Sequence, residues 1–111
     1  MKKSEIKFSV VLDKDRIPEK ILWNATEDLN NNINKTKSIS VSIWDEVNKN
    51  TLRIDLWTKD MTVNDMKKFY IDTIGGLSQS ILNSTGDSYM SKETNLLCDK
   101  LVKYIKEKKI I

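Results

Sequence analysis

The stretch Ser38-Ile-Ser-Val-Ser-Ile-Trp-Asp-Glu-Val47, continued by Asn48-Lys-Asn50 and Thr51-Leu-Arg-Ile-Asp-Leu-Trp-Thr58, decides the fold. Apolar and polar residues alternate in both long runs, which predicts β-strands over residues 38–47 and 51–58. The asparagines of the short segment between them tolerate the positive φ that a tight hairpin turn requires. Each strand has one apolar face, so we expect a sheet that covers a core on one side only.

The residues before this hairpin predict two further strands. Residues 4–13 carry apolar side chains at alternate positions, namely Ile6, Phe8, Val10 and Leu12. A second, short strand is predicted where Ile21, Trp23 and Ala25 alternate in the same way. Pro18 between these strands predicts a turn or an edge position, because proline cannot donate a hydrogen bond to a sheet. The segment from Thr26 to Lys37, with its run Asn30-Asn31-Asn32, is typical of a polar loop.

The second half of the chain predicts two helices. Thr62 is a candidate N-cap, and apolar residues then recur at spacings of three and four: Val63, Met66, Tyr70, Ile74, Leu77 and Ile81. Gly86 suits the left-handed residue that ends such a helix. The second helix is predicted from Ser88 or Ser91 to Lys108, with an inner face of Met90, Thr94, Leu97, Leu101, Tyr104 and Ile105. Gly75-Gly76 lies inside the first helix and indicates either a close approach to a neighbouring element or a hinge.

Strands at about 4–58 therefore precede helices at about 62–109. This order predicts an α+β protein in which a four-stranded antiparallel sheet is followed by two C-terminal helices packed on one face. A length of 111 residues favours a single domain over residues 1–111.

The composition disfavours most kinds of catalytic site. The chain has no histidine and one cysteine, Cys98, so a zinc site, a Ser-His-Asp triad and a Cys-His pair all lack their residues. Cys98 lies in an apolar helical stretch and is expected to be a buried small hydrophobe. No glycine-rich phosphate loop is present, and we expect no metal or other cofactor. The chain is predicted not to be an enzyme. The alternative is a carboxylate enzyme using Asp45, Asp55 and Asp60, which requires at least one acid with a raised pKa.

The charge and hydropathy of the sequence indicate where the protein is located and which class of partner it binds. The formal charge is +3, and the basic excess near the C-terminus is expected to interact with the dipole of the last helix rather than with nucleic acid: Lys100, Lys103, Lys106, Lys108 and Lys109. No apolar run is long enough to span a membrane. Because Glu5 and Lys7 interrupt the first apolar stretch, no signal peptide is expected, and a cytoplasmic location is predicted.

Two tryptophans suggest a binding surface. If the helices cover the apolar face of the hairpin, Trp44 and Trp57 stand on the opposite face with Arg53 and Asp55. Tryptophan and arginine are the residue types enriched at binding hot spots. We therefore predict that these four residues contact a protein partner or, through this sheet face, a second copy of the chain. A pairing of Val47 with Leu52 would place Trp44 opposite Asp55. The alternative is a bulge near Asp45 that turns one tryptophan into the core.

The same residues carry a family resemblance. Four segments contribute to it: Ser40-Val-Ser-Ile-Trp-Asp45; Leu52-Arg-Ile-Asp-Leu-Trp-Thr-Lys-Asp-Met61 with Asp65-Met66-Lys67; Ile17-Pro-Glu-Lys-Ile21 with Trp23; and Thr85-Gly-Asp87. Together they resemble the gliding motility-associated protein GldC family of Bacteroidetes. The resemblance implies a small accessory of the gliding machinery, and it brings no catalytic residues with it. We interpret the chain as a cytoplasmic interaction module serving gliding or its linked secretion apparatus. The alternative is a chaperone for exported polypeptides, since strands followed by two helices are also similar to SecB-type chaperones.

Overall fold

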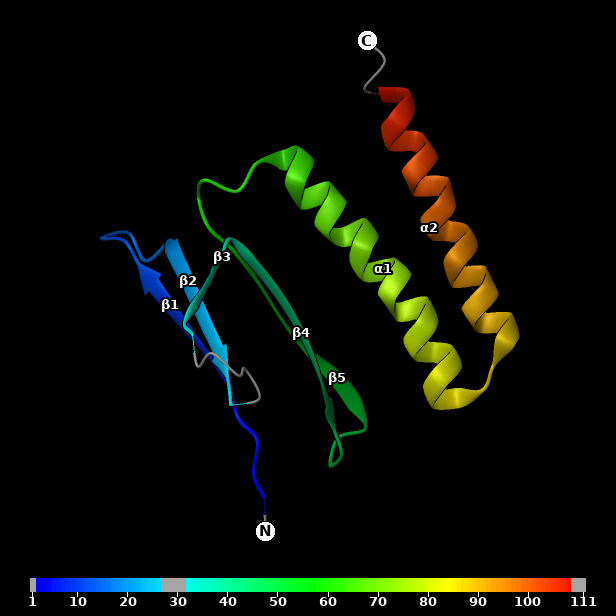
Figure 1. The fold of residues 1–111 in the computed structure, drawn as a ribbon, viewed down its shortest axis with the longest axis horizontal. Helices are drawn as coiled ribbons and strands as arrows, with labels where there is room; N and C mark the ends of the chain where they lie inside the picture. The colour runs from blue at the N-terminus through cyan, green and yellow to red at the C-terminus, as the bar shows by residue number, and fades with distance from the viewer. Residues whose placement is uncertain (1, 27–31, 109–111) are drawn as a thin grey trace. The chain divides into compact units, whose positions relative to one another are not determined.

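The computed structural model describes residues 2–26 and 32–108. The chain divides between Thr62 and Val63 into two compact units. The first unit contains five strands and the second contains two helices (Figure 1). This arrangement confirms the α+β class and the order of strands before helices. The single domain over both units stays a prediction.

The first unit holds a three-stranded antiparallel sheet. Its strands, in the spatial order β1-β2-β3, are β1 (Ile6–Leu12), β2 (Pro18–Ala25) and β3 (Asn34–Thr36). Phe8 lies opposite Trp23 and Val10 opposite Ile21, so the predicted apolar alternation of both strands is present. Ile21 lies on the central strand and is 0% exposed, the only fully buried large apolar side chain among the described residues. The core of this sheet is therefore centred on β2.

Pro18 begins β2 and lies opposite Leu12, where the pairing of β1 and β2 becomes irregular. A strand start is a position at which the missing N–H of proline is tolerated. The turn before it is held by Asp13, whose carboxylate accepts hydrogen bonds from the backbone N–H groups of Asp15 at 2.8 Å and Ile17 at 3.0 Å. The prediction of a turn next to Pro18 is confirmed.

The prediction of a continuous loop from Thr26 to Lys37 is wrong at its end, because β3 pairs with β2 through Thr36 opposite Ile21. The three residues of β3 carry no apolar alternation, so only the neighbouring strand indicates that they are extended. Residues 27–31, which include Asn30 and Asn31, lie outside the described part of the chain.

A separate two-stranded antiparallel sheet contains β4 (Ser38–Asp45) and β5 (Asn50–Trp57). The expectation of one four-stranded sheet is therefore wrong. The chain passes from β3 to β4 at Lys37, whose carbonyl accepts a hydrogen bond from the N–H of Thr58 at 2.8 Å. The N–H of Lys59 donates to the carbonyl of Pro18 at 3.1 Å. These two hydrogen bonds connect the hairpin to the first sheet, but among the described residues no strand of one sheet pairs with a strand of the other.

The hairpin turn comprises residues 46–49, earlier than predicted, and it shifts the expected register. Asp45 pairs with Asn50, and Leu52 lies opposite Ile43 rather than Val47. The Asp45 carboxylate explains the early turn, since it accepts hydrogen bonds from the N–H of Val47 at 3.0 Å and from the side-chain amide of Asn48 at 2.8 Å. The positive φ of 55° belongs to Lys49, not to either asparagine.

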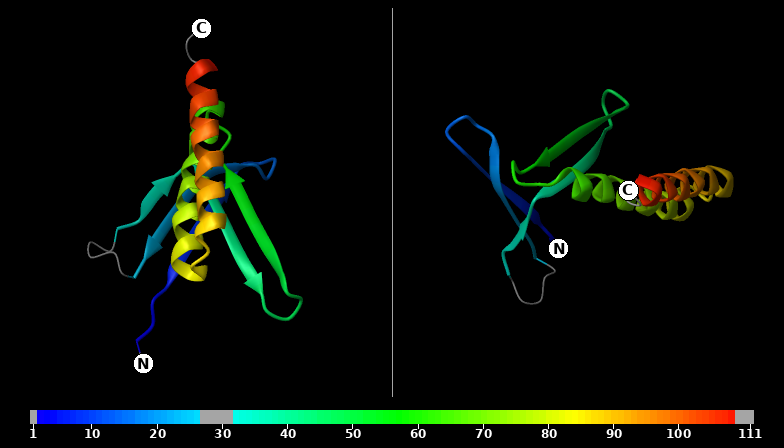
Figure 2. Two further views of the ribbon diagram at one scale, coloured as in Figure 1. Left: turned by 90° about the vertical axis from the view of Figure 1, so that its right-hand side faces the viewer. Right: turned by 90° about the horizontal axis from the view of Figure 1, so that it is seen from above.

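The second unit is a helical hairpin made of α1 (Val63–Thr85) and α2 (Ser88–Lys108). The two helices contact each other: they lie side by side in Figure 1, and one overlaps the other in both views of Figure 2. α1 begins directly after Thr62, as predicted, and ends at Thr85, where the φ of 73° at the following Gly86 confirms the left-handed ending. Asp87 then caps α2, because its carboxylate accepts a hydrogen bond from the N–H of Met90 at 2.9 Å. Lys106 and Lys108 occupy the last turn of α2, where cations oppose the helix dipole.

Small residues form the seam between α1 and α2. The hydroxyl of Ser78 donates to the carbonyl of Ser91 at 2.8 Å, the hydroxyl of Ser91 donates to the carbonyl of Ser78 at 2.7 Å, and both side chains are buried. A Cβ on Gly75 would lie 3.4 Å from the sulfur of Cys98, which is only partly buried. The predicted close approach is thus confirmed at Gly75, whereas a Cβ on Gly76 would meet nothing within 4 Å.

We expect the two adjacent glycines to respond oppositely to the same substitution. Gly75→Leu forces a large side chain against Cys98 and should lower the free energy of unfolding by about 1–3 kcal/mol. Gly76→Leu has room for its side chain and should raise the free energy of unfolding by up to about 1 kcal/mol through helix propensity. Urea denaturation of both variants measures this difference. Equal effects at the two positions would contradict the close approach of Gly75, but not Gly76, to the second helix.

Candidate protein-interaction surface

One face of the β4–β5 hairpin brings together all four residues predicted to bind a partner. Since the ladder has no irregularity, alternate positions point the same way, and eight side chains share this face: Ser38, Ser40, Ser42, Trp44, Thr51, Arg53, Asp55 and Trp57. Trp44 is 57% exposed and Trp57 is 52% exposed. Neither tryptophan is turned inward, so the bulge alternative does not apply. We call this surface the tryptophan face.

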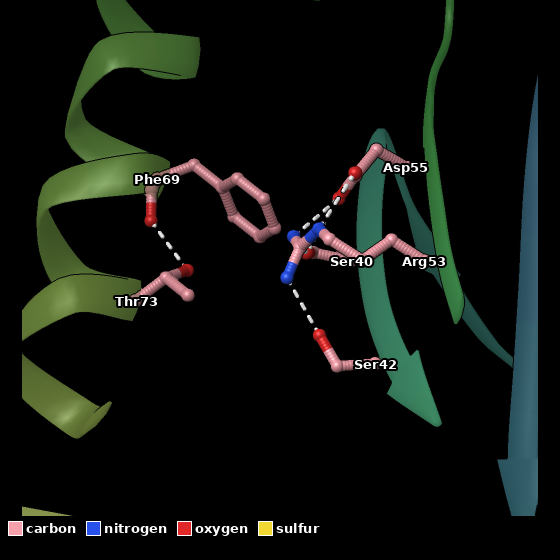
Figure 3. A network of polar contacts seen from close by, with 6 residues as sticks. All are labelled: Ser40, Ser42, Arg53, Asp55, Phe69 and Thr73. Atoms are coloured by element: carbon pink, nitrogen blue, oxygen red, sulfur yellow. Dashed lines mark hydrogen bonds and ion pairs between the residues drawn. The ribbon is translucent and has the colours of Figure 1, made fainter. Parts of the chain in front are cut away.

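The centre of the tryptophan face is a closed polar cluster (Figure 3). The Arg53 guanidinium donates to the Asp55 carboxylate at 3.2 Å from Nε and at 2.9 Å from Nη2. It also donates to the hydroxyl of Ser42 at 2.6 Å and to the hydroxyl of Ser40 at 2.7 Å. The Ser40 hydroxyl donates in turn to Asp55 at 2.6 Å. Most donors of Arg53 are therefore already engaged, and the cluster holds its side chains in fixed positions.

The carboxylates of the hairpin and its exit are all bound to structural partners. The hydrogen bonds from Arg53, and then the one from Ser40, hold the pKa of Asp55 below its ordinary value. The side-chain amide of Asn48 lowers the pKa of Asp45 in the turn. The hydroxyl of Thr58, at 2.6 Å, lowers the pKa of Asp60. A general acid at neutral pH requires a pKa shifted in the other direction.

The two tryptophans lie at opposite ends of the tryptophan face. Trp44 lies opposite Thr51, and Trp57 lies opposite Ser38, so the predicted placement of Trp44 opposite Asp55 is wrong. Six residues of β4 separate the two ends, which corresponds to about 20 Å along an antiparallel strand. The indole N–H of Trp44 donates to Glu46 at 2.9 Å, which orients its ring. The face therefore offers two apolar anchors with a polar centre between them.

A shallow apolar hollow lies beside Trp57. It is lined by Ile17, Pro18, Asp55, Leu56, Trp57 and Lys59. Lys59 is held over this region by ion pairs with Asp13 at 3.2 Å and Glu19 at 3.9 Å. Neither Ile17 nor Lys59 was among the predicted site residues. Their only signal in the sequence was that both belong to the segments that carry the family resemblance.

A second apolar surface lies on one side of the helical hairpin. Because small residues fill the seam, large side chains remain about half exposed on both helices: Tyr70, Leu77, Met90, Leu97 and Tyr104. A groove on this side is lined in part by Tyr70, Ile74, Leu101 and Tyr104. We call it the helical apolar side. It requires cover from another part of the protein or from a partner.

The low pKa of Asp55 has a testable dependence on Arg53. The charged form of Asp55 stabilises the hairpin, so its contribution is complete above the unfolded pKa of about 3.9 and is lost as the pH falls through the lower folded pKa. Carboxyl chemical shifts measured by NMR should give Asp55 a midpoint below 3.9. In Arg53→Gln the midpoint should rise toward the ordinary value. An Asp55 midpoint unchanged by this substitution would contradict the conclusion that Arg53 lowers the pKa of Asp55.

None of the described helices is both long and apolar enough to cross a membrane, and no group of three possible metal ligands occurs among the described residues. Neither the curated proteins nor the solved structures yield a match. The family described as gliding motility-associated protein GldC-like matches residues 18–107, which include β2 to β5 with the tryptophan face, all of α1 and nearly all of α2. The chain belongs to the GldC-like family of gliding motility-associated proteins.

Proposed function

We propose that the chain is a non-enzymatic accessory of gliding motility that acts in the cytoplasm as a protein–protein interaction module. The family supports the association with gliding. The observation that carries the interaction role is the tryptophan face, where two half-exposed tryptophans flank a preorganised Arg53–Asp55 cluster. The lowered pKa values of Asp45, Asp55 and Asp60 support the absence of acid–base catalysis by the carboxylates of the hairpin and its exit.

Trp44 and Trp57 are the anchors of this proposed interface. Large aromatic side chains that become buried on binding contribute most of the binding free energy at hot spots. The hollow beside Trp57 offers a site for one apolar side chain of the partner. Arg53 and Asp55 neutralise each other, so they supply a fixed polar centre rather than a net charge. A span of about 20 Å suits an extended segment of roughly six residues.

The same proposal assigns the opposite face of the hairpin to the protein interior. That face carries six apolar side chains, Ile39, Val41, Ile43, Leu52, Ile54 and Leu56. Three of them are about half exposed, namely Ile43, Leu52 and Ile54. Such a surface requires apolar cover. In this proposal apolar cover of this face leaves the tryptophan face for the partner.

A chaperone for exported polypeptides is the second candidate function. It is favoured by the helical apolar side, whose groove between Tyr70 and Tyr104 would accept apolar segments of varied sequence. The two candidates differ in specificity. A chaperone suppresses the aggregation of unrelated unfolded proteins, whereas an interaction module binds one folded partner and leaves that aggregation unchanged.

Removal of both anchors should abolish the interaction. Trp44→Ser/Trp57→Ser deletes the two aromatic side chains and is expected to weaken partner binding at least 100-fold, since each hot-spot residue contributes about 2 kcal/mol or more. Val47→Ser is the matched control, because Val47 lies in the turn of the same hairpin and is more exposed than either tryptophan. Tagged wild type and both variants would be compared by quantitative affinity capture from a gliding bacterium.

The expected result is a protein retained by wild type and by Val47→Ser but lost with the tryptophan variant, together with loss of surface spreading in cells that carry only that variant. Circular dichroism establishes that the variant is folded. Equal capture by all three proteins would refute the role of the tryptophan face. Suppression of aggregation by wild type and by the tryptophan variant alike would favour the chaperone.

A further inference from the structure

The outer edge of β4 lacks the features that keep strand edges from pairing. β4 pairs with β5 on one side, and no other strand of the described residues pairs with it. Exposed edges are normally protected by lysine, proline or a bulge. From Ile39 to Ile43 this strand contains only serine, isoleucine and valine, and its ladder is regular. By contrast, β1 carries Lys7 and an irregularity at Val11, and β5 carries Arg53 and Asp55.

We propose that a second copy of the chain pairs with this edge, β4 against β4, in antiparallel orientation about a two-fold axis at Val41. A symmetric pair of identical strands forms a closed dimer. In this register the residue numbers of each facing pair add to a constant, so Ile39 faces Ile43 of the second copy and Ser40 faces its Ser42. Val41 faces its own counterpart. Ile39, Val41 and Ile43 therefore each meet an apolar residue and Ser40 meets Ser42, while Ser38 at the end of the strand faces Trp44 of the second copy.

Charge complementarity selects this register over its neighbours. Lys37 precedes β4 and Asp45 ends it, so the two would face each other twice across the dimer, once on each side of the axis. Lys37 would then lie between Asp45 of the second copy and Asp60 of its own chain, with which it forms an ion pair at 3.4 Å. A register centred on Ser42 would instead place Asp45 opposite Ile39 and Trp44 opposite Ser40. A one-residue slip would bring apolar and polar faces together on the same side. Of these registers, the pairing about Val41 matches residue type from Ile39 to Ile43 and also places Lys37 opposite Asp45.

The dimer would contain a continuous four-stranded sheet in the order β5-β4-β4-β5. All twelve apolar side chains of the two hairpins would share one face, which enlarges the surface available for a core. Both tryptophan faces would lie on the other side, next to each other. A partner with two binding segments, or a dimeric partner, would then gain from avidity.

The test combines solution mass with cysteine cross-linking. Light scattering of wild type should give about 26 kDa, twice the chain mass of 12.9 kDa. In a Cys98→Ser background, Val41→Cys should form an intermolecular disulfide under mild oxidation, because facing Cα atoms in an antiparallel pair lie about 4.5–5.5 Å apart. Ile39→Cys is the matched control. Its counterpart lies four residues away along the strand, about 13 Å, and should remain unlinked.

Mixing Ile39→Cys with Ile43→Cys should restore cross-linking, because these positions face each other in the proposed register. A monomeric wild type at tens of micromolar would overturn the proposal. A dimer in which Val41→Cys fails to cross-link, or in which Ile39→Cys alone cross-links as well as Val41→Cys does, would also overturn it. The wild-type mass and the mixing experiment remain decisive if Val41→Cys does not fold. The cross-linking variants leave Trp44 and Trp57 unchanged, so this test can fail without affecting the partner-binding test.

Discussion

The cross-strand cluster of Arg53 with Ser40, Ser42 and Asp55 is the constraint on which the rest of the strand unit depends. Its hydrogen bonds form only when Ser42 lies opposite Arg53 and Ser40 opposite Asp55. A shift of two residues would keep the apolar face intact but would break these contacts, so the cluster selects one register among those that hydrophobic burial allows. That register separates the two tryptophans and gives the tryptophan face its polar centre.

Both units bury little apolar surface. Ile21 is the only fully buried large apolar side chain among the described residues, and the helical seam is built from Gly75, Ser78, Ser91 and Cys98. Small residues allow a close approach of the helices but bury little apolar surface. Large apolar side chains consequently remain on the outside of both units. This is the pattern expected of a chain that completes its core through contacts beyond each unit, and it agrees with a role in binding other proteins.

The sequence predicted the elements whose residues alternate or recur regularly, and it missed features that depend on neighbours in space. The strands around Ile21 and Val41 and both helices followed from periodicity. β3 could not be predicted, because Asn34–Thr36 has no apolar pattern and is extended only through its pairing with β2. The hairpin register was missed because the Asp45 carboxylate forms the turn, whereas asparagine propensity pointed to residues 48–50. The prediction that Trp44, Arg53, Asp55 and Trp57 share one face is still correct, because the observed register differs from the predicted one by an even number of residues. Ile17 and Lys59 join the site only through the contact of β2 with β5.

The three tryptophans allow a direct test of the central claim that the tryptophan face binds the partner. Each indole N–H gives its own signal in an NMR spectrum of ¹⁵N-labelled protein, and Trp23 in β2 serves as an internal reference. On titration with the captured partner, the signals of Trp44 and Trp57 should shift or broaden while that of Trp23 stays in place. A perturbation confined to Trp23, or none at Trp44 and Trp57 at saturating partner, would contradict the account.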